Sequence, residues 1–371
     1  MSAYLANLTL RTFRNYAALD LALAPGVSVF VGRNGQGKSN VLEAVCYLAL
    51  LRSFWAQNIG ILRQWGADGF AVEGRLDCTE GDSLGKHALF AQFGERRLLR
   101  LDGNPVERAS DFINQFQCVP LVPEDIDLIW GAARERRWFL NILCSQVQPG
   151  YLGHLQALHE AIRSRNAVLW AGDAYSKHVL AAYDELLIKH GAEIEAVRGQ
   201  VVDRLNEHLG KVAGRLFVDG PGALAVEYSS FADERLSVAD LATAYREVLV
   251  RSQPRDAKEG RTSVEPHLAN LNLHLAGRPV ARYGSEGKCR LTALALCLAS
   301  LGVIREPDLR DRAVVLLVDN VFGELDPHRR EAFFHCVAEA DQVLITATEY
   351  PPKLPTEGTR VFHVQARDIH P

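Results

Sequence analysis

The chain has 371 residues, a length that suggests two or three domains. Hydrophobic residues make up 48% of it and charged residues 23%, which excludes a disordered tail protein, a collagen and a disulfide scaffold. With 41 basic and 45 acidic residues the formal net charge is -4, so any contact with DNA requires a local basic face.

The seven cysteines are odd in number and include no Cys-x-x-Cys pair, which favours a reduced, cytoplasmic protein. The first residues lack a basic stretch followed by an apolar core, so no secretory signal is expected. Charge-free apolar runs fall short of the roughly 18–20 residues that span a bilayer, and we therefore expect no membrane partner.

The first third of the chain alternates between apolar and polar residues, a pattern typical of strands. Strands are expected over 8–13, 19–23 and 27–31, and a glycine-rich turn then leads into a helix over 41–48. Further strands are expected over 70–76, 87–93 and 97–101.

From about residue 134 the apolar residues recur at helical spacing, which predicts helical stretches over 136–147, 152–187 and 193–212. Breaks are expected at Gly150, Gly191 and 220–222, and a mobile loop over 251–261. Without sustained heptads, a long coiled coil is not expected. The chain then predicts a strand over 271–275, a helix over 286–301, a strand over 314–318, a helix after Pro327 and a strand over 343–346.

One segment, between the predicted strand 27–31 and helix 41–48, fits the phosphate-loop pattern G-x-x-x-x-G-K-[ST] without exception. Its residues are Gly32, Arg33, Asn34, Gly35, Gln36, Gly37, Lys38 and Ser39. Glycines let backbone N–H groups point at phosphate oxygens, and the helix N-terminus adds positive potential. Lys38 is expected on the β- and γ-phosphates of a nucleotide, and the Ser39 hydroxyl on Mg²⁺.

A second carboxylate is needed to organise Mg²⁺, and the apolar strand 314–318 ends in one at Asp319. Asp319 lies far along the chain from Lys38, as in a head whose sheet is split by a long insertion. Two weaker elements flank this strand. Ser285-Glu286-Gly287-Lys288 opens an apolar helix, and Asp326 precedes Pro327; alone, each equally fits an ordinary helix cap.

The order of these elements resembles that of ABC-type ATPase heads of the SMC class, and in detail the RecF family. The segments that carry this resemblance span nearly the whole chain: 13–16, 34–44, 51–54, 123–129, 136–140 and 277–279. The resemblance implies an α/β P-loop ATPase head, with a mixed-sheet lobe I, a mainly helical inserted lobe II and no long coiled coil. The implied boundaries are 1–125 for the N-terminal half of lobe I, 126–265 for lobe II and 266–371 for the C-terminal half of lobe I with the signature.

By this resemblance the chain binds ATP and Mg²⁺, dimerises head to head around two ATP molecules, holds DNA, and works with RecO and RecR to load RecA at gaps. Ser285 and Gly287 then belong to a signature that acts in trans on the partner's γ-phosphate, and Asp326 lies at the dimer seam. Glu124 is similar in position to the glutamine-loop residue that senses Mg²⁺. Arg14, Asn15 and Asn40 complete the expected nucleotide site.

The chain departs from the family at Asn320, where a second acid usually follows Asp319. That acid is the expected base for the attacking water, and losing such a base costs about 10²–10⁴-fold in rate. We therefore expect slow or almost absent hydrolysis with nucleotide binding intact, unless Glu324 or a water network replaces the base. The signature also departs from the usual Ser-Gln-Gly-Gln, and 265–270 keeps only part of an expected upstream run.

Basic side chains in three places are candidates for contacts with DNA phosphates, and ordinary solvated arginine remains the simpler interpretation of each. They are Arg52, Arg63, Arg134, Arg136 and Arg137, with a further group at Arg96, Arg97 and Arg100.

Two other functions stay open: an ATP-binding regulatory paralogue without a DNA role, and a phosphotransferase acting on a small molecule.

Overall fold

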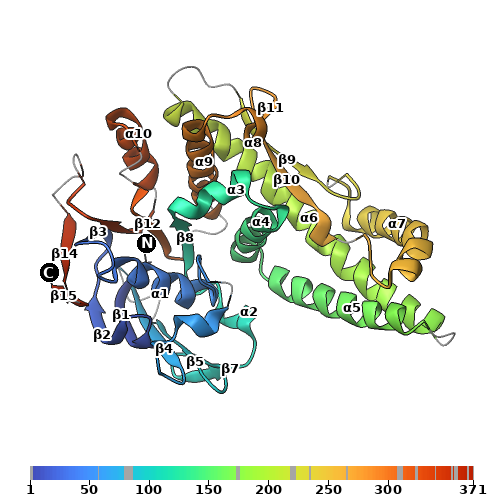
Figure 1. Ribbon diagram of the computed structural model, residues 1–371, viewed down its shortest axis with the longest axis horizontal. Coiled ribbons are helices and arrows are strands. Elements are labelled where there is room, and N and C mark those ends of the chain that lie inside the picture. Colours follow the sequence, from blue (N-terminus) through green and yellow to red (C-terminus); the bar gives the residue numbers. More distant parts are fainter. Residues whose placement is uncertain are drawn as a thin grey trace. The chain divides into compact units, whose positions relative to one another are not determined.

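The computed structural model describes residues 3–56, 58–78, 87–172, 176–217, 223–233, 235–264, 266–306, 312–321, 325–338, 340–351, 354, 358–365 and 367–370. The chain divides into two compact units. Unit 1 contains Met1–Ile126, Lys211–Gly220 and Ala293–Pro371, and unit 2 contains Asp127–Gly210 and Pro221–Thr292. Figure 1 shows the elements coloured along the sequence.

Unit 1 contains two six-stranded sheets. The first is antiparallel, in the order β2-β1-β4-β5-β6-β7. Its strands are β1 (Ala3–Phe13), β2 (Tyr16–Ala22), β4 (Phe70–Cys78), β5 (His87–Phe93), β6 (Leu98–Leu101) and β7 (Asn104–Val106). A single helical turn, α2 (Ala109–Phe112), follows it in the chain.

The second sheet has the order β15-β14-β3-β13-β12-β8 and is parallel except for β15. Its strands are β3 (Gly26–Val31), β8 (Gln117–Leu121), β12 (Val314–Asp319), β13 (Gln342–Ala347), β14 (Thr359–Gln365) and β15 (Asp368–His370). Every residue of β12 and β13 is buried, which explains their continuous apolar runs. The carboxyl ends of β3, β13, β12 and β8 therefore meet at one edge.

Helix α1 (Lys38–Leu50) contacts both sheets and is buried on nearly all sides, as its apolar sequence requires. A buried glutamine also joins the sheets directly. The Gln342 side chain of β13 donates to the carbonyls of Leu5 (3.0 Å) and Ala24 (2.8 Å) and accepts from the Leu5 amide at 3.0 Å. Unit 1 also contains the 3₁₀ turns η1 (Ile59–Leu62) and η2 (Pro123–Ile126) and helix α10 (Pro327–Val337).

Unit 2 is mainly helical, with a three-stranded antiparallel sheet in the order β11-β10-β9. Its strands are β9 (Leu224–Ser229), β10 (Asn270–Leu275) and β11 (Arg278–Pro279). Its helices are α3 (Asp127–Trp130), α4 (Ala133–Val147), α5 (Tyr151–Ala171), α6 (Ser176–Leu216), α7 (Val238–Glu259) and α8 (Val280–Tyr283), with a 3₁₀ turn η3 (Pro266–Leu268). Helices α6 and α9 (Glu286–Ile304) each continue from unit 2 into unit 1 along the chain.

The helical block differs from prediction at 152–187 and at Gly191. The stretch 152–187 is two helices, because α5 ends at Gly172 in the left-handed conformation. The expected break at Gly191 is wrong, since α6 runs through it; a Cβ there would lie 2.5 Å from the ring of Tyr245, so this glycine permits close packing. The cluster at 220–222 lies outside the described residues.

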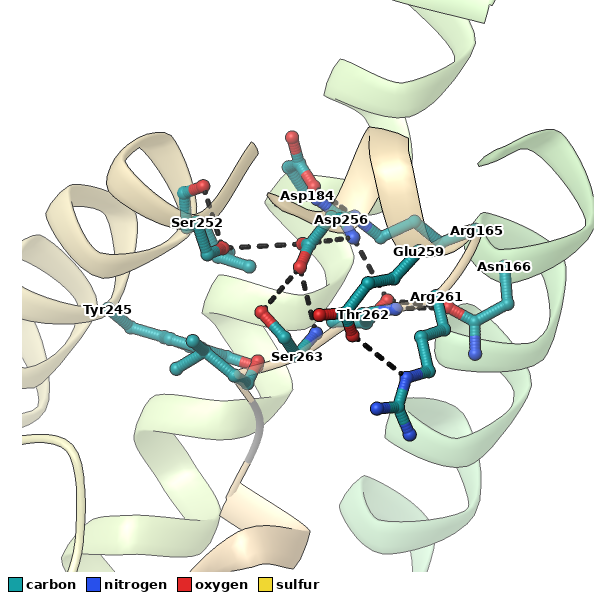
Figure 2. Close-up of polar contacts among 12 residues, drawn as sticks. Arg165, Asn166, Asp184, Tyr245, Ser252, Asp256, Glu259, Arg261, Thr262 and Ser263 are labelled. Atoms are coloured by element: carbon teal, nitrogen blue, oxygen red, sulfur yellow. Dashed lines mark hydrogen bonds and ion pairs between the residues drawn. The ribbon is translucent and has the colours of Figure 1, made fainter. Parts of the chain in front are cut away.

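The loop expected over 251–261 is instead helical as far as Glu259, and a buried ion network explains why (Figure 2). Arg165 on α5 bonds Asp184 (2.7 Å), Asp256 (2.8 Å) and Thr262 (2.9 Å). Asp256 also accepts from the Ser263 amide and hydroxyl at 2.9 and 2.6 Å. This network fixes the C-terminal part of α7 despite its polar sequence.

Two further observations bear on the predicted organisation. Residues 266–292, predicted as part of the C-terminal lobe I segment, group with unit 2, and Lys211–Gly220 group with unit 1.

Helix α9 is long and apolar enough to cross a membrane, with a mean hydropathy of 1.5, but 83% of that window is buried in the protein. It is therefore a core helix.

Candidate nucleotide site

The phosphate loop connects β3 to α1, and two of its glycines have no substitute. Gly37 adopts φ +108, and a Cβ there would lie 2.4 Å from Asn15 Nδ2. A Cβ on Gly32 would lie 2.3 Å from the carbonyl oxygen of Val364 on β14. The first turn of α1 contains no acid, so nothing on it opposes an anion at the helix N-terminus.

Lys38 is held inside its own loop. It is 7% exposed, and its Nζ donates to the carbonyls of Gly32 (2.6 Å) and Arg33 (2.9 Å). Burial lowers the pKa of Lys38, while the nearby charge of Asp319 raises it. A compact ammonium with only backbone partners can exchange them for phosphate oxygens.

Ser39 and Asp319 converge as predicted. Ser39 Oγ donates to Asp319 Oδ1 at 2.7 Å, and Thr346 Oγ1 on β13 donates to the same oxygen. Burial raises the pKa of Asp319, against the hydrogen bonds from Thr346 and Ser39, which lower it. A hydroxyl beside one carboxylate fits Mg²⁺, which keeps several waters and takes phosphate ligands, and no three-residue metal cluster occurs among the described residues.

Asn320 and Glu124 follow the ends of neighbouring strands. Asn320 has φ 52, and its backbone N–H donates to the carbonyl oxygen (3.3 Å) and hydroxyl (3.2 Å) of Thr346. Glu124 is exposed in η2, and its Oε2 accepts from Trp55 Nε1 at 3.1 Å. Burial is the main cause of the raised pKa of Asp319, and the charge of Glu124 adds to it. Glu324, the alternative base, lies outside the described residues.

The turn between β1 and β2 contacts the phosphate loop through Asn15. Asn15 Nδ2 donates to the Gln36 carbonyl at 3.3 Å, and Asn15 Oδ1 accepts from Asn40 Nδ2 at 2.6 Å. Arg14 instead turns to α1, where its Nε and Nη2 each lie 2.7 Å from the fully buried Glu43 carboxylate. Asn15 and Asn40 thus brace the phosphate loop, whereas Arg14 anchors the turn.

Sequence reasoning missed four residues that shape this site: Tyr16, Glu43, Trp55 and Thr346. Only Glu43 gave a signal, because it is an acid within the otherwise apolar stretch 41–48.

The signature residues Ser285 and Gly287 lie in unit 2, at the start of α9. Ser285 Oγ accepts from the Lys288 amide at 3.4 Å, a helix-capping contact. In unit 1, Asp326 caps α10 by accepting from the amides of His328 and Arg329, both at 3.0 Å. These backbone hydrogen bonds lower the pKa of Asp326. Ser285 and Asp326 therefore each cap a helix, and their expected place at a dimer seam stays a prediction.

The candidate DNA-binding arginines separate into two groups. Arg52, Arg63 and Arg134 are exposed, and Arg134 pairs with Glu135 at 2.9 Å. Arg136 instead donates to Asn270 Oδ1 at 3.0 Å and to the Gly131 carbonyl at 2.9 Å, and Arg137 to the Ala269 carbonyl at 3.3 Å. The last two hold unit 2 together, which leaves the exposed group as the stronger candidates.

Comparison with known proteins agrees with this geometry. The family model described as RecF/RecN/SMC N terminal domain matches residues 4–366. The DNA replication and repair protein RecF of Acidothermus cellulolyticus is 33% identical over 97% of this chain and 98% of its own. That of Frankia alni is 34% identical over 98% of each. A solved structure of the recombination mediator protein RecF-ATP in the RecFOR pathway shares the fold, with a TM-score of 0.89 at 24% identity over 100% of this chain and 97% of that one.

Proposed function

This chain belongs to the RecF family of DNA replication and repair proteins, and we propose that it is an ATP-gated, DNA-binding protein of recombinational repair and replication-fork maintenance. The observation that carries the proposal is the phosphate loop, with Lys38 enclosed in it and the Ser39–Asp319 pair beside it. A relative of known structure is described as RecF-ATP, which supports ATP as the nucleotide.

In the proposed site the loop N–H groups and the N-terminus of α1 bind the phosphates, and Lys38 leaves its two carbonyls for the β- and γ-phosphate oxygens. Ser39 and Asp319 hold Mg²⁺, which neutralises phosphate charge when bound. Since Asn320 has no carboxylate, hydrolysis is slow, and the ATP-bound state persists.

The proposed active form is a head-to-head dimer. Ser285 and Gly287 of one copy meet the γ-phosphate held by the other, and Asp326 lies at the seam. Exposed arginines such as Arg52, Arg63 and Arg134 contact DNA phosphates, so binding depends weakly on sequence. With RecO and RecR as partners, the dimer assists RecA loading at gaps in the cytoplasm.

Sedimentation with and without Mg-ATP and a gapped duplex tests the proposal. ATP should convert a monomer into a dimer that retains DNA, and Lys38→Met should abolish both changes. If wild-type protein binds ATP but stays monomeric and does not bind DNA, the proposed gated dimer is wrong.

The second candidate, an ATP-binding regulatory paralogue, is favoured by the internal bonding of Arg136 and Arg137, which removes two of the predicted DNA contacts. It predicts the same ATP affinity but no binding of duplex DNA at any salt concentration, so a salt-titrated DNA-binding assay separates the two.

A further inference from the structure

The site lacks an acid at position 320, yet two other strand ends at the same edge bring carboxylates. Strand β12, which ends at Asp319, is hydrogen-bonded to β8 on one side and β13 on the other, both in parallel. Beyond β8 the chain reaches Glu124, and beyond β13 it reaches Glu349. Because parallel strands end at one edge, both acids follow strands that flank Asp319.

Only the first of these acids is oriented within the described part of the chain. Glu124 Oε2 accepts from Trp55 Nε1 at 3.1 Å, on a segment that follows the strand paired with β12. Glu349 is exposed, and no hydrogen bond or ion pair to another described residue fixes its carboxylate. Within the described part of the chain, a hydrogen bond therefore orients the Glu124 carboxylate, and none orients that of Glu349.

The indole that holds Glu124 is itself anchored to the helix that begins at the phosphate loop. Ser53 Oγ accepts from the backbone amides of Trp55 (2.9 Å) and Ala56 (2.7 Å) and donates to Glu43 on α1. Glu43 in turn is paired with Arg14 at 2.7 Å. Phe54 packs edge-on against the Trp55 ring, with centroids 4.6 Å apart. The position of Glu124 is thus fixed relative to α1 by a continuous set of contacts.

We propose that Glu124, positioned by Trp55, takes the place of the missing acid at residue 320 and accepts the proton of the attacking water. The inference rests on the proposed function, since it concerns hydrolysis at the same site. As the bond from the water oxygen to the γ-phosphorus forms, the bond from that phosphorus to the bridging oxygen breaks. ADP leaves with the electron pair, and the water proton passes to the Glu124 carboxylate.

Steady-state hydrolysis by the full chain tests the proposal, with ATP affinity measured separately by calorimetry. Glu124→Gln should lower kcat by about 100-fold and change ATP affinity by less than about twofold, because the amide keeps the shape but accepts no proton. Trp55→Phe should lower kcat by about 10-fold through misplacement of Glu124. Glu349→Gln is the matched control, because Glu349 follows β13 on the other side of β12 and no contact with a described residue orients its carboxylate; it should leave kcat unchanged.

Rescue separates a chemical role from a structural one. Adding Asn320→Asp to Glu124→Gln supplies a carboxylate at the neighbouring position and should restore kcat to at least the wild-type value. Failure of this rescue with ATP affinity intact, or a loss in Glu349→Gln equal to that in Glu124→Gln, overturns the proposal. Wild-type protein that binds ATP and dimerises on DNA without any turnover also overturns it and leaves the proposed function standing; loss of ATP binding itself defeats the proposed function.

A second measurement needs no nucleotide. In protein with ¹⁵N-labelled tryptophan, the five indole N–H groups give separate resonances, and Trp55→Phe identifies that of Trp55. Glu124→Gln should shift this resonance because a charged acceptor is replaced by a neutral one, and Glu349→Gln should not. An unmoved resonance in Glu124→Gln means that the indole does not hold Glu124, and the positioning role is then wrong.

Discussion

Each unit buries a cation, Lys38 in unit 1 and Arg198 in unit 2, and the two cations have different kinds of partner. Among the described residues of unit 1, the Lys38 ammonium donates only to two backbone carbonyls of its own loop. In unit 2 the Arg198 guanidinium bonds Tyr151 Oη (3.0 Å), Tyr228 Oη (3.2 Å), Asn141 Oδ1 (3.0 Å) and the Pro266 carbonyl (2.5 Å), and pairs with Glu195.

The different partners of Lys38 and Arg198 indicate different roles for the two charges. Burial alone would lower the pKa of Arg198, but Tyr151, Tyr228 and Glu195 raise it well above its ordinary value, so this charge is permanent. Its partners come from separate elements and join them, as those of Arg165 do. A buried charge that bonds several elements is architectural, whereas one that bonds only its own loop is available to a ligand.

The largest effect that tests this distinction is expected in unit 2. Arg198→Met should destabilise the protein by about 3–5 kcal/mol, because Glu195 is left buried without its cation. Urea unfolding followed by circular dichroism measures the loss. Replacing the whole pair, as Glu195→Leu with Arg198→Met, should recover part of it, and a double variant as unstable as the single one would refute the pairing.

The opposite pattern is expected at Lys38. Lys38→Met should weaken ATP binding by about 100-fold, since a charge-assisted contact to phosphate is lost, yet leave the unfolding midpoint unchanged or higher. Calorimetry and thermal unfolding on the same preparation give both numbers. A loss of stability as large as that of Arg198→Met would show that Lys38 is architectural as well.

Asp125, the residue after Glu124, is a third ionisable group that burial affects. Its carboxyl oxygen accepts a hydrogen bond from the Val122 amide at 2.8 Å. Desolvation raises the pKa of Asp125 to about 7 from 3.8. Because the folded value lies above the unfolded one, its contribution to stability is fully present below about pH 4 and is lost as the pH rises towards 7. Asp125→Asn keeps an acceptor for Val122, and its unfolding free energy should therefore lack this slope between pH 4 and 7. An unchanged slope would assign it to other groups.

The smallest expected effect separates the two groups of arginines. Arg63→Gln, at an exposed position, should lower the salt dependence of duplex binding by about one unit of slope without changing stability. Arg136→Gln, which loses bonds to Asn270 and Gly131, should change stability rather than the salt slope. Fluorescence anisotropy over a salt series checks both variants, and the reverse outcome would exchange their roles.

Much of this arrangement follows from local sequence. The phosphate loop and Asp319 are recognisable because glycines, Lys38 and a buried strand ending in an acid occur at fixed spacing. The roles of Gly191 and Asp256 were not predictable, since each depends on a partner distant in the chain, Tyr245 and Arg165. For the same reason the contact between Arg14 and Glu43 was not predictable.

The strand order of the parallel sheet also determines when it can form. Its N-terminal strands β3 and β8 do not pair with each other; β3 pairs with β13 and β14, and β8 with β12. During synthesis both apolar strands therefore emerge long before any neighbour, and Gln342, which ties β13 to β1, emerges later still. Such long-range pairing makes folding slow and leaves strand edges exposed. A nascent chain that ends at Thr292 thus carries the whole phosphate-loop sequence, while the two strands that pair with β3 have not yet been made.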